Sequence, residues 1–228
     1  DVYLVEAGYF PSRQKAREAV VRGDVSVGGK TVLKPSKTVL SGEAVTVSAN
    51  DERFVSNGGY KLYKAFQDFK FSPKGLVFAD IGASNGGFTD CLLKFGAEKV
   101  IAIDVGESQL DKTIACNERV VIKDNFNARY LTAESLGGFV DGVTADVSFI
   151  SLTYILKNVA DALKDGGVAL LLIKPQFELN AAALNKNGLV TSDALRKSAV
   201  KRVYDFALGV GLVPVDFTVA PVKEKKNV

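Results

Sequence analysis

Apolar residues follow two kinds of spacing, one typical of strands and one typical of helices, and these alternate through most of the chain. From residue 76 onward, short apolar runs of strand length are separated by longer stretches with helical spacing. We expect strands at 76–81, 100–104, 119–123, 141–146, 167–173 and 213–219, and helices at 87–95, 107–115, 131–136, 150–163 and 192–209. This alternation predicts an α/β domain with a doubly wound, mostly parallel sheet. Ligands of such sheets bind beyond the carboxyl ends of the strands.

The first 48 residues have a different pattern and predict a small, separate α+β domain. Ser12 suits the N-cap of a helix that Gly23 would end, and the Gly28-Gly29 turn between β-branched runs predicts a hairpin. Residues 49–59 are polar and contain turn residues, so they predict a linker. The second domain is then expected to span residues 60–228. Short strands of the first domain are expected at 25–27, 30–32, 37–40 and 44–47.

The turn from Asp80 to Gly87 is the leading candidate for a ligand site. Glycine has no Cβ and lets a ligand approach the backbone closely, and the start of the next helix offers free N–H groups. A dinucleotide fingerprint would need glycine at position 84, where this chain has Ser84. Asp80 would repel a pyrophosphate but suits an amine, and Asp104, after the next strand, suits ribose hydroxyls. A plain tight turn is the alternative.

S-adenosylmethionine joins an adenosine to an amino-acid cation and therefore fits both ends of this candidate site. We predict that Asp80 and the glycine turn hold the methionine part, that Asp104 holds the ribose, and that Asn127 lies near the adenine. The predicted cofactor-binding residues are Asp80, Gly82, Ala83, Ser84, Gly86, Gly87, Phe88, Thr89, Asp104, Val105, Asn127 and Asp146.

A lysine and an aspartate follow two neighbouring strands and suggest base chemistry. Lys174 ends an apolar run, where a lysine is costly unless it has a partner or a role, and Asp146 ends the strand before it. Burial and a second cation make a lysine easier to deprotonate, so that it can take a proton from a hydroxyl. Lys61, in a helix expected at 60–66, is a candidate for that cation. The alternative is a lysine that extends from the strand end into solvent.

Positive charge is concentrated in the first domain and indicates an RNA partner. Residues 11–37 hold seven basic and two acidic side chains, a net charge of +5, while the whole chain carries +3. Arg13 and Arg17 share a helix face because they are four residues apart. Such a cluster is typical of phosphate binding, although a solvated helix face is the alternative. The predicted RNA-binding residues are Ser12, Arg13, Lys15, Arg17, Arg22 and Lys30.

Composition excludes several other classes of function. The chain has no histidine, which removes imidazole chemistry, and its two cysteines, Cys91 and Cys116, make neither a disulfide framework nor a metal cluster. The hydrophobic fraction of 47% suffices for a buried core. The longest apolar run, 168–173, is far shorter than the ~18 residues of a membrane span. We expect a cytoplasmic protein with no bound metal and no stable membrane partner.

Several motifs resemble known RNA-modifying families. Residues 12–17, 23–27 and 29–30 resemble the S4 RNA-binding domain. The second domain resembles the FtsJ-like methyltransferases, and the two together resemble the TlyA family of hemolysin-labelled ribosomal RNA 2′-O-methyltransferases. The motifs that carry this likeness are 56–62, 80–90, 104–106, 127–129, 146–152 and 174–178.

The resemblance implies a Rossmann-like class I methyltransferase fold, with S-adenosylmethionine as cofactor and ribosomal RNA or ribosomal subunits as partner. It also implies a Lys-Asp-Lys-Glu tetrad, of which Lys61, Asp146 and Lys174 are present. Glu224 does not match the fourth position, and the family's last strand, which would lie beside 213–219, is expected to be missing. Asn57 stands where the family usually has arginine. An RNA-binding module with a non-catalytic cofactor site and a membrane-acting hemolysin remain as alternatives.

Overall fold

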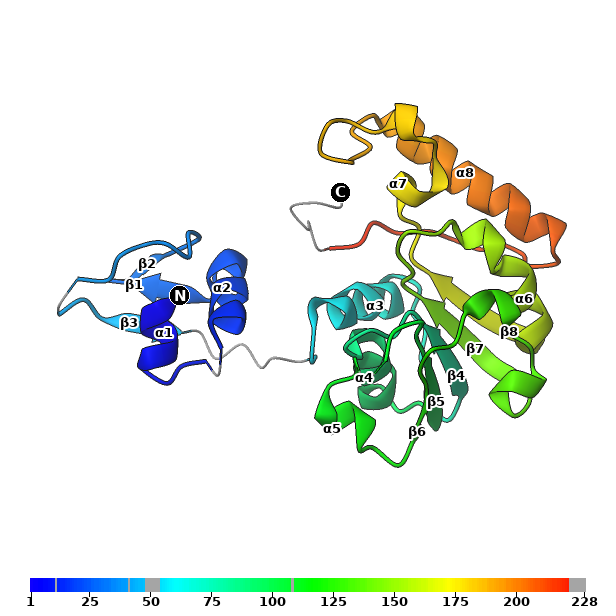
Figure 1. The fold of residues 1–228 in the computed structure, drawn as a ribbon, viewed down its shortest axis with the longest axis horizontal. Helices are drawn as coiled ribbons and strands as arrows, with labels where there is room; N and C mark the ends of the chain where they lie inside the picture. The colour runs from blue at the N-terminus through cyan, green and yellow to red at the C-terminus, as the bar shows by residue number, and fades with distance from the viewer. Residues whose placement is uncertain (11, 41, 48–53, 108, 222–228) are drawn as a thin grey trace. The chain divides into compact units, whose positions relative to one another are not determined.

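Two separate units account for the residues described by the structure, a computed structural model (Figure 1). It describes residues 1–10, 12–40, 42–47, 54–107 and 109–221. The units are Asp1–Arg53 and Phe54–Val228. Residues 54–59, which the sequence predicts as linker, therefore belong to the second unit, and Phe54 is buried in it. Residues 49–53 of the predicted linker lie outside the described residues.

A three-stranded antiparallel sheet and two helices form the first unit. The elements are α1 (Val2–Glu6), α2 (Arg13–Arg22), β1 (Val25–Val27), β2 (Lys30–Thr31) and β3 (Val45–Val47), with the sheet order β2-β1-β3. The predicted N-cap is confirmed, since the Ser12 side chain accepts a hydrogen bond from the Lys15 N–H at 3.3 Å. Gly23 ends α2 with φ 91, as expected.

The strand predicted at 37–40 is wrong, because this segment pairs with no strand of the sheet. Leu40 is 64% exposed there, so burial of its side chain gives the segment no reason to join the sheet. The core of the unit lies instead between α1, α2 and β1, and consists of Leu4, Ala16, Ala19, Val20 and Val25.

A five-stranded parallel sheet forms the centre of the second unit, as the alternating pattern predicts. Its strand order is β6-β5-β4-β7-β8, and every neighbouring pair is parallel. The last strand begins earlier than predicted, at Leu163, and ends at Leu171. The strands are β4 (Val77–Ile81), β5 (Lys99–Ile103), β6 (Val120–Lys123), β7 (Val140–Ala145) and β8 (Leu163–Leu171).

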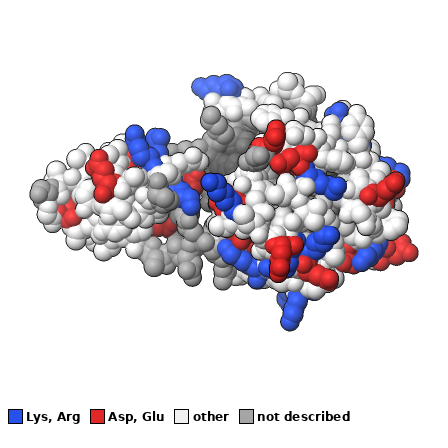
Figure 2. Space-filling view, turned by 60° about the horizontal axis from the view of Figure 1, so that its bottom comes forward, with Lys and Arg blue, Asp and Glu red and all other residues white. Residues whose placement is uncertain are grey.

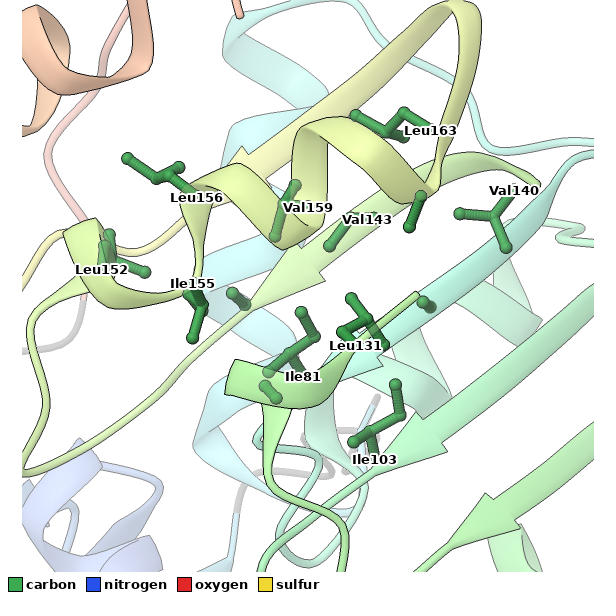
Figure 3. Close-up of a cluster of buried hydrophobic side chains, with 14 of the residues drawn as sticks. Ile81, Ile103, Leu131, Val140, Val143, Leu152, Ile155, Leu156, Val159 and Leu163 are labelled. Carbon is green, nitrogen blue, oxygen red and sulfur yellow. The ribbon is translucent and has the colours of Figure 1, made fainter. Parts of the chain in front are cut away.

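Helices cover both faces of this sheet (Figure 1). On one face α3 (Asn57–Asp68), α4 (Gly87–Lys94) and α5 (Lys112–Ala115) enclose an aromatic-rich core around Phe78. On the other face α6 (Leu156–Ala162) and α8 (Asp193–Gly209) pack on aliphatic side chains of the strands. Figure 3 shows this second core, in which Ile81, Ile103 and Val143 of the sheet meet the side chains before and within α6.

Three predicted helices are shorter in the structure than their patterns suggest. The segment 107–115 forms only α5, apart from residue 108, which lies outside the described residues. The segment 131–136 contains a single 3-10 turn, Glu134–Leu136, and 150–163 contains the 3-10 turn Leu152–Tyr154 followed by α6. Helical spacing of apolar residues indicates which side chains face the core, but it does not by itself set where a helix begins and ends.

The strand predicted at 213–219 is wrong for the described part of the chain. The segment alternates in the expected way, but Val213, Val215, Phe217 and Val219 are 71–94% exposed. No described strand lies beside it, so its backbone gains no ladder of hydrogen bonds. Instead the Thr218 hydroxyl bonds the Asp68 carboxylate at the end of α3.

Candidate functional site

The carboxyl ends of the central strands gather the predicted site residues at one edge of the sheet. Residue Asp104 follows β5, the glycine turn follows β4, and Asp146 follows β7. Lys174 lies just after β8, before the short helix α7 (Pro175–Glu178). Parallel strands place the loops that follow them side by side, and the sequence predicts this arrangement. It does not predict that α3, which carries Lys61, lies at the same edge.

The glycine turn brings the β4 loop against the β7 loop. A Cβ on Gly82 would lie 2.8 Å from the Asp146 carbonyl oxygen, and Gly82 has φ +77. Gly86 caps α4 with φ 93. Ser84 also lies in the left-handed region, with φ 48, and is exposed at the tip of the turn beside the buried Ala83. The two glycines therefore let the turn pack against neighbouring loops, and Ser84 is the part of it that is exposed to a ligand.

Asp104 ties the glycine turn to the loop after β5. Its Oδ2 accepts a hydrogen bond from the Ser84 N–H, and its Oδ1 accepts one from the Gly106 N–H, both at 2.8 Å. Each carboxylate oxygen has a second lone pair, so the side chain can still accept hydrogen bonds from a pair of hydroxyls. Val105, next to it, is 70% exposed and provides apolar surface at the same edge.

Asp80 lies beneath the turn. Its carboxylate accepts hydrogen bonds from Thr89 Oγ1 at 2.7 Å and Thr144 Oγ1 at 2.8 Å, and the residue is 0% exposed. Burial raises the pKa of Asp80 to about 6, and the negative charge of Asp146 adds to this, while the two threonine hydrogen bonds lower the pKa. Thr89 and Phe88, also predicted to bind cofactor, are buried with it. The hydrogen bond between Thr89 and Asp80 holds α4 to the sheet, and none of the three residues is more than 6% exposed.

Asn127 lies on the surface after β6, where the sequence predicts it. Its side-chain oxygen accepts a hydrogen bond from the Arg129 N–H at 3.0 Å and caps a 3-10 turn. The role of Asn127 near an adenine stays a prediction.

Two lysines meet one carboxylate at the centre of the edge. Lys174 Nζ lies 2.6 Å from Asp146 Oδ1, and Lys61 Nζ lies 3.4 Å from Asp146 Oδ2. The three side chains are only 10–17% exposed. Lys61 comes from α3, 85 residues before Asp146. The structure thus brings together the three predicted catalytic residues, including the one that the sequence could not place.

Two features of this lysine–aspartate cluster were not predicted. Lys174 Nζ also donates a hydrogen bond to Ser148 Oγ at 2.8 Å, which gives the amine a second polar neighbour. Within the described part of the chain, no group donates a hydrogen bond to the buried Asp146 Oδ1, whose contact with Lys174 lies outside hydrogen-bond geometry. Ser148 lies within the motif 146–152 that carries the family resemblance, but no role was predicted for it.

Close packing of glycines places α3, and with it Lys61, beside the turn. A Cβ on Gly87 would lie 2.2 Å from Ser56 Oγ and 2.9 Å from the Gly59 backbone nitrogen. A Cβ on Gly59 would in turn overlap the Phe54 ring at 2.3 Å. The first turn of α4 can therefore approach α3 this closely only because residue 87 is glycine, whereas Gly59 makes room for the Phe54 ring.

The basic residues of the first unit are mostly on its surface. Arg13 and Arg17 each form an ion pair with Asp1 at 3.3 Å and remain 63% and 64% exposed. Lys30 is exposed and Lys15 is half-buried. The side chain of Arg22 lies outside the described part of the structure. Figure 2 shows basic and acidic side chains intermixed on the visible face, so this face does not carry charge of a single sign.

Within the described residues, no group of three or more His, Cys, Asp or Glu side chains is arranged to hold a metal ion. The helices described there include none with the length and apolar character needed to cross a bilayer.

Known proteins match both units. Residues 54–228 match the FtsJ-like methyltransferase family, and residues 1–45 match the S4 domain. The 16S/23S rRNA (cytidine-2′-O)-methyltransferase TlyA of Mycobacterium tuberculosis is 38% identical over 223 residues, covering 97% of this chain and 83% of the relative. Hemolysin A of Brachyspira hyodysenteriae is 37% identical over 228 residues, covering 100% of this chain and 95% of the relative.

A solved structure of a hemolysin candidate from Streptococcus thermophilus has the same fold. It superposes with a TM-score of 0.71 and 36% sequence identity, covering 92% of this chain and 77% of that one. The match over residues 54–228 agrees with the fold of the second unit, a parallel sheet with the glycine turn and the site residues at its carboxyl edge. This chain is a member of the FtsJ-like methyltransferase family and carries an S4 domain in front of its methyltransferase domain.

Proposed function

We propose that this protein transfers a methyl group from S-adenosylmethionine to a ribose 2′-hydroxyl of ribosomal RNA. The observation that carries the proposal is the pair of lysine amines on the two oxygens of Asp146, beside the glycine turn. A 2′-hydroxyl is a weak nucleophile until its proton leaves. Lys174, in its neutral form, is the base that takes this proton.

The surroundings of Lys174 support this role. Asp146 and Ser148 hold its amine from two sides, and Lys61 provides a second cation on the same carboxylate. Base catalysis of this kind supplies ~10²–10⁴-fold in rate. Alignment of the reacting atoms can supply up to ~7–11 kcal/mol, so the larger part of the acceleration comes from how the site holds its reactants.

The residues around the turn fit the proposed cofactor. The bound cofactor supplies the methyl group. Asp104 has lone pairs left for two ribose hydroxyls, and the neighbouring Ser84 is exposed at the tip of the turn. Asp80 is buried, so we assign it to the support of the turn rather than to direct contact with the methionine part. Asn127 is the proposed neighbour of the adenine.

The proposed substrate follows from the first unit and from the relatives. The S4 match and the exposed arginines of α2 support contact with RNA phosphates. The TlyA relative is named for a cytidine in 16S and 23S rRNA, so we propose a cytidine ribose as the target. An enzyme with this substrate acts on ribosomes in the cytoplasm.

The test is transfer of labelled methyl from S-adenosylmethionine to purified ribosomal subunits, with the labelled nucleotide identified after digestion. Wild type should label a ribose 2′-oxygen, and Lys174→Ala should slow this by ~10²-fold or more. Lys164→Ala is the matched control. Lys164 of β8 also pairs with an aspartate of β7, since its Nζ lies 2.6 Å from Asp141 Oδ1. This ion pair lies at the opposite end of the two strands from Lys174.

The outcomes separate the proposal from its alternatives. Equal loss of activity in the two lysine variants would point to general damage of the β7–β8 pair. A rate within a few-fold of wild type for Lys174→Ala would remove Lys174 as the base. Tight binding of cofactor and RNA without any turnover would favour a binding module instead.

A further inference from the structure

A buried glutamate behind the lysine–aspartate cluster joins the two loops that carry it. Glu178, the last residue of α7, is only 2% exposed. Its Oε2 accepts a hydrogen bond from Ser151 Oγ at 2.5 Å, and its Oε1 accepts one from the Leu152 N–H at 2.9 Å. A buried carboxylate is costly unless it is hydrogen-bonded, and these two donors, one to each oxygen, account for its burial.

The contact between Glu178 and Ser151 joins the two loops that carry Lys174 and Asp146. Ser151 lies five residues after Asp146, and Glu178 lies four residues after Lys174. At their other ends both loops are held by the sheet, where the Asp146 N–H bonds the Ile81 carbonyl at 3.0 Å. Each loop is therefore fastened at both ends, and the hydrogen bonds of Glu178 close the far side.

Two further observations indicate that the hydrogen bonds of Glu178 stabilise the loop after β7. Phe149, between Asp146 and Ser151, has φ 62, a conformation that costs free energy for a bulky side chain and persists only where neighbours impose it. The backbone carbonyl of Glu178 accepts a hydrogen bond from Arg202 Nη1 of α8 at 2.8 Å. The glutamate thus links the strained β7 loop to a long, well-packed helix.

We propose that Glu178, together with Ser151, is a positioning residue for methyl transfer: it holds the Lys174 loop and the Asp146 loop in register. The inference rests on the proposed function of Lys174 as base. A displacement of about 1 Å in a catalytic group can lower the rate by ~10²-fold, so a bond that sets the 2.6 Å contact between Lys174 and Asp146 affects turnover directly.

The test replaces one acceptor while keeping the size of the side chain. Glu178→Gln removes the charge and replaces one acceptor oxygen by an amide NH2, so the short charge-assisted hydrogen bond from Ser151 becomes a weaker neutral one in which the Ser151 hydroxyl accepts. We expect kcat for methyl transfer to fall roughly 10- to 100-fold, with KM for S-adenosylmethionine within about twofold of wild type. Ser151→Ala should behave in the same way, and Ser151→Thr, which keeps the hydroxyl, should restore most of the rate.

A double-mutant cycle distinguishes positioning from simple damage. If Glu178 acts through Lys174, Glu178→Gln should produce no further loss in a Lys174→Ala background, because the positioned group is already gone. An equal loss in both backgrounds, or a kcat unchanged by Glu178→Gln and Ser151→Ala, would overturn the inference.

A second measurement does not depend on activity. Hydrogen exchange at amides 147–152, 173–174 and 176–177 should become faster in Glu178→Gln, while exchange in β4 stays as in wild type. Unchanged exchange in both loops would overturn the positioning role even for a protein that proves not to be a methyltransferase. Absence of labelled product from wild type, with faster loop exchange in the variant, would instead count against the proposed function alone.

Discussion

Asp80, the buried carboxylate below the glycine turn, should make the stability of the second unit depend on pH. Asp80→Asn preserves the size and shape of the side chain. The asparagine oxygen can accept a hydrogen bond from one threonine, and its amide can donate to the hydroxyl oxygen of the other, because Thr89 and Thr144 hydroxyls rotate. The substitution therefore removes the ionisation of residue 80 and little else.

The magnitude follows from the pKa of Asp80, which burial raises from 3.8 to about 6. A raised carboxyl pKa means that the folded protein binds the proton more tightly than the unfolded chain. This tighter binding of the proton at Asp80 stabilises the folded protein fully below pH 3.8, and the stabilisation is lost as the pH rises to about 6. At about 1.4 kcal/mol per pH unit, the total is about 3 kcal/mol, and asparagine has no such dependence.

The assay is hydrogen exchange of β4 and β7 amides in increasing urea, which reports the free energy of unfolding of the second unit. Between about pH 4 and pH 7, the unfolding free energy of wild type should fall by about 2 kcal/mol relative to that of Asp80→Asn, because part of the total is already lost at pH 4. Asp141→Asn is the control. The hydrogen bond from Lys164 lowers the pKa of Asp141, so its effect on stability is lost only below pH 3.8.

A difference between wild type and Asp80→Asn that stays constant across this pH range would refute the reasoning. It would mean that the Asp80 carboxylate is as well solvated in the folded protein as in the unfolded chain. Asp141→Asn keeps Asp80 and should therefore fall with pH as wild type does; a fall of wild type relative to Asp141→Asn of similar size would mean that the change with pH does not come from residue 80.

Three further outcomes are expected. Gly87→Ala should lower the free energy of unfolding by about 1–3 kcal/mol in urea, because its Cβ would lie 2.2 Å from Ser56 Oγ; Gly209→Ala, with nothing within 4 Å, should not destabilise α8. Asp104→Ala removes a charged acceptor and should weaken S-adenosylmethionine binding by at least ~10-fold in calorimetry, with RNA binding in the absence of cofactor unchanged. Arg17→Ala should weaken RNA binding and reduce the slope of log affinity against log salt by about 1 in a salt titration, and an unchanged slope would remove this residue from the RNA contact.

The sequence determined the architecture of the second unit and the location of its site. Strand-length apolar runs that alternate with helices leave few arrangements other than a parallel sheet, and the residues after each strand then share one edge. Asp104, Asp146 and Lys174 could be chosen for that reason alone. The cap at Ser12 and the stop at Gly23 were also predictable, because they depend on the backbone of neighbouring residues.

Only the tertiary structure decided which distant groups meet. Lys61 reaches Asp146 because α3 packs closely on α4 at Gly87, and spacing along the chain carries no information about such a contact. Asp80 proved to be buried on two threonines rather than open to a ligand. The segment 213–219 has the alternation of a strand but forms none, since periodicity shows which faces could be buried, whereas a strand exists only where a neighbouring strand supplies its hydrogen bonds.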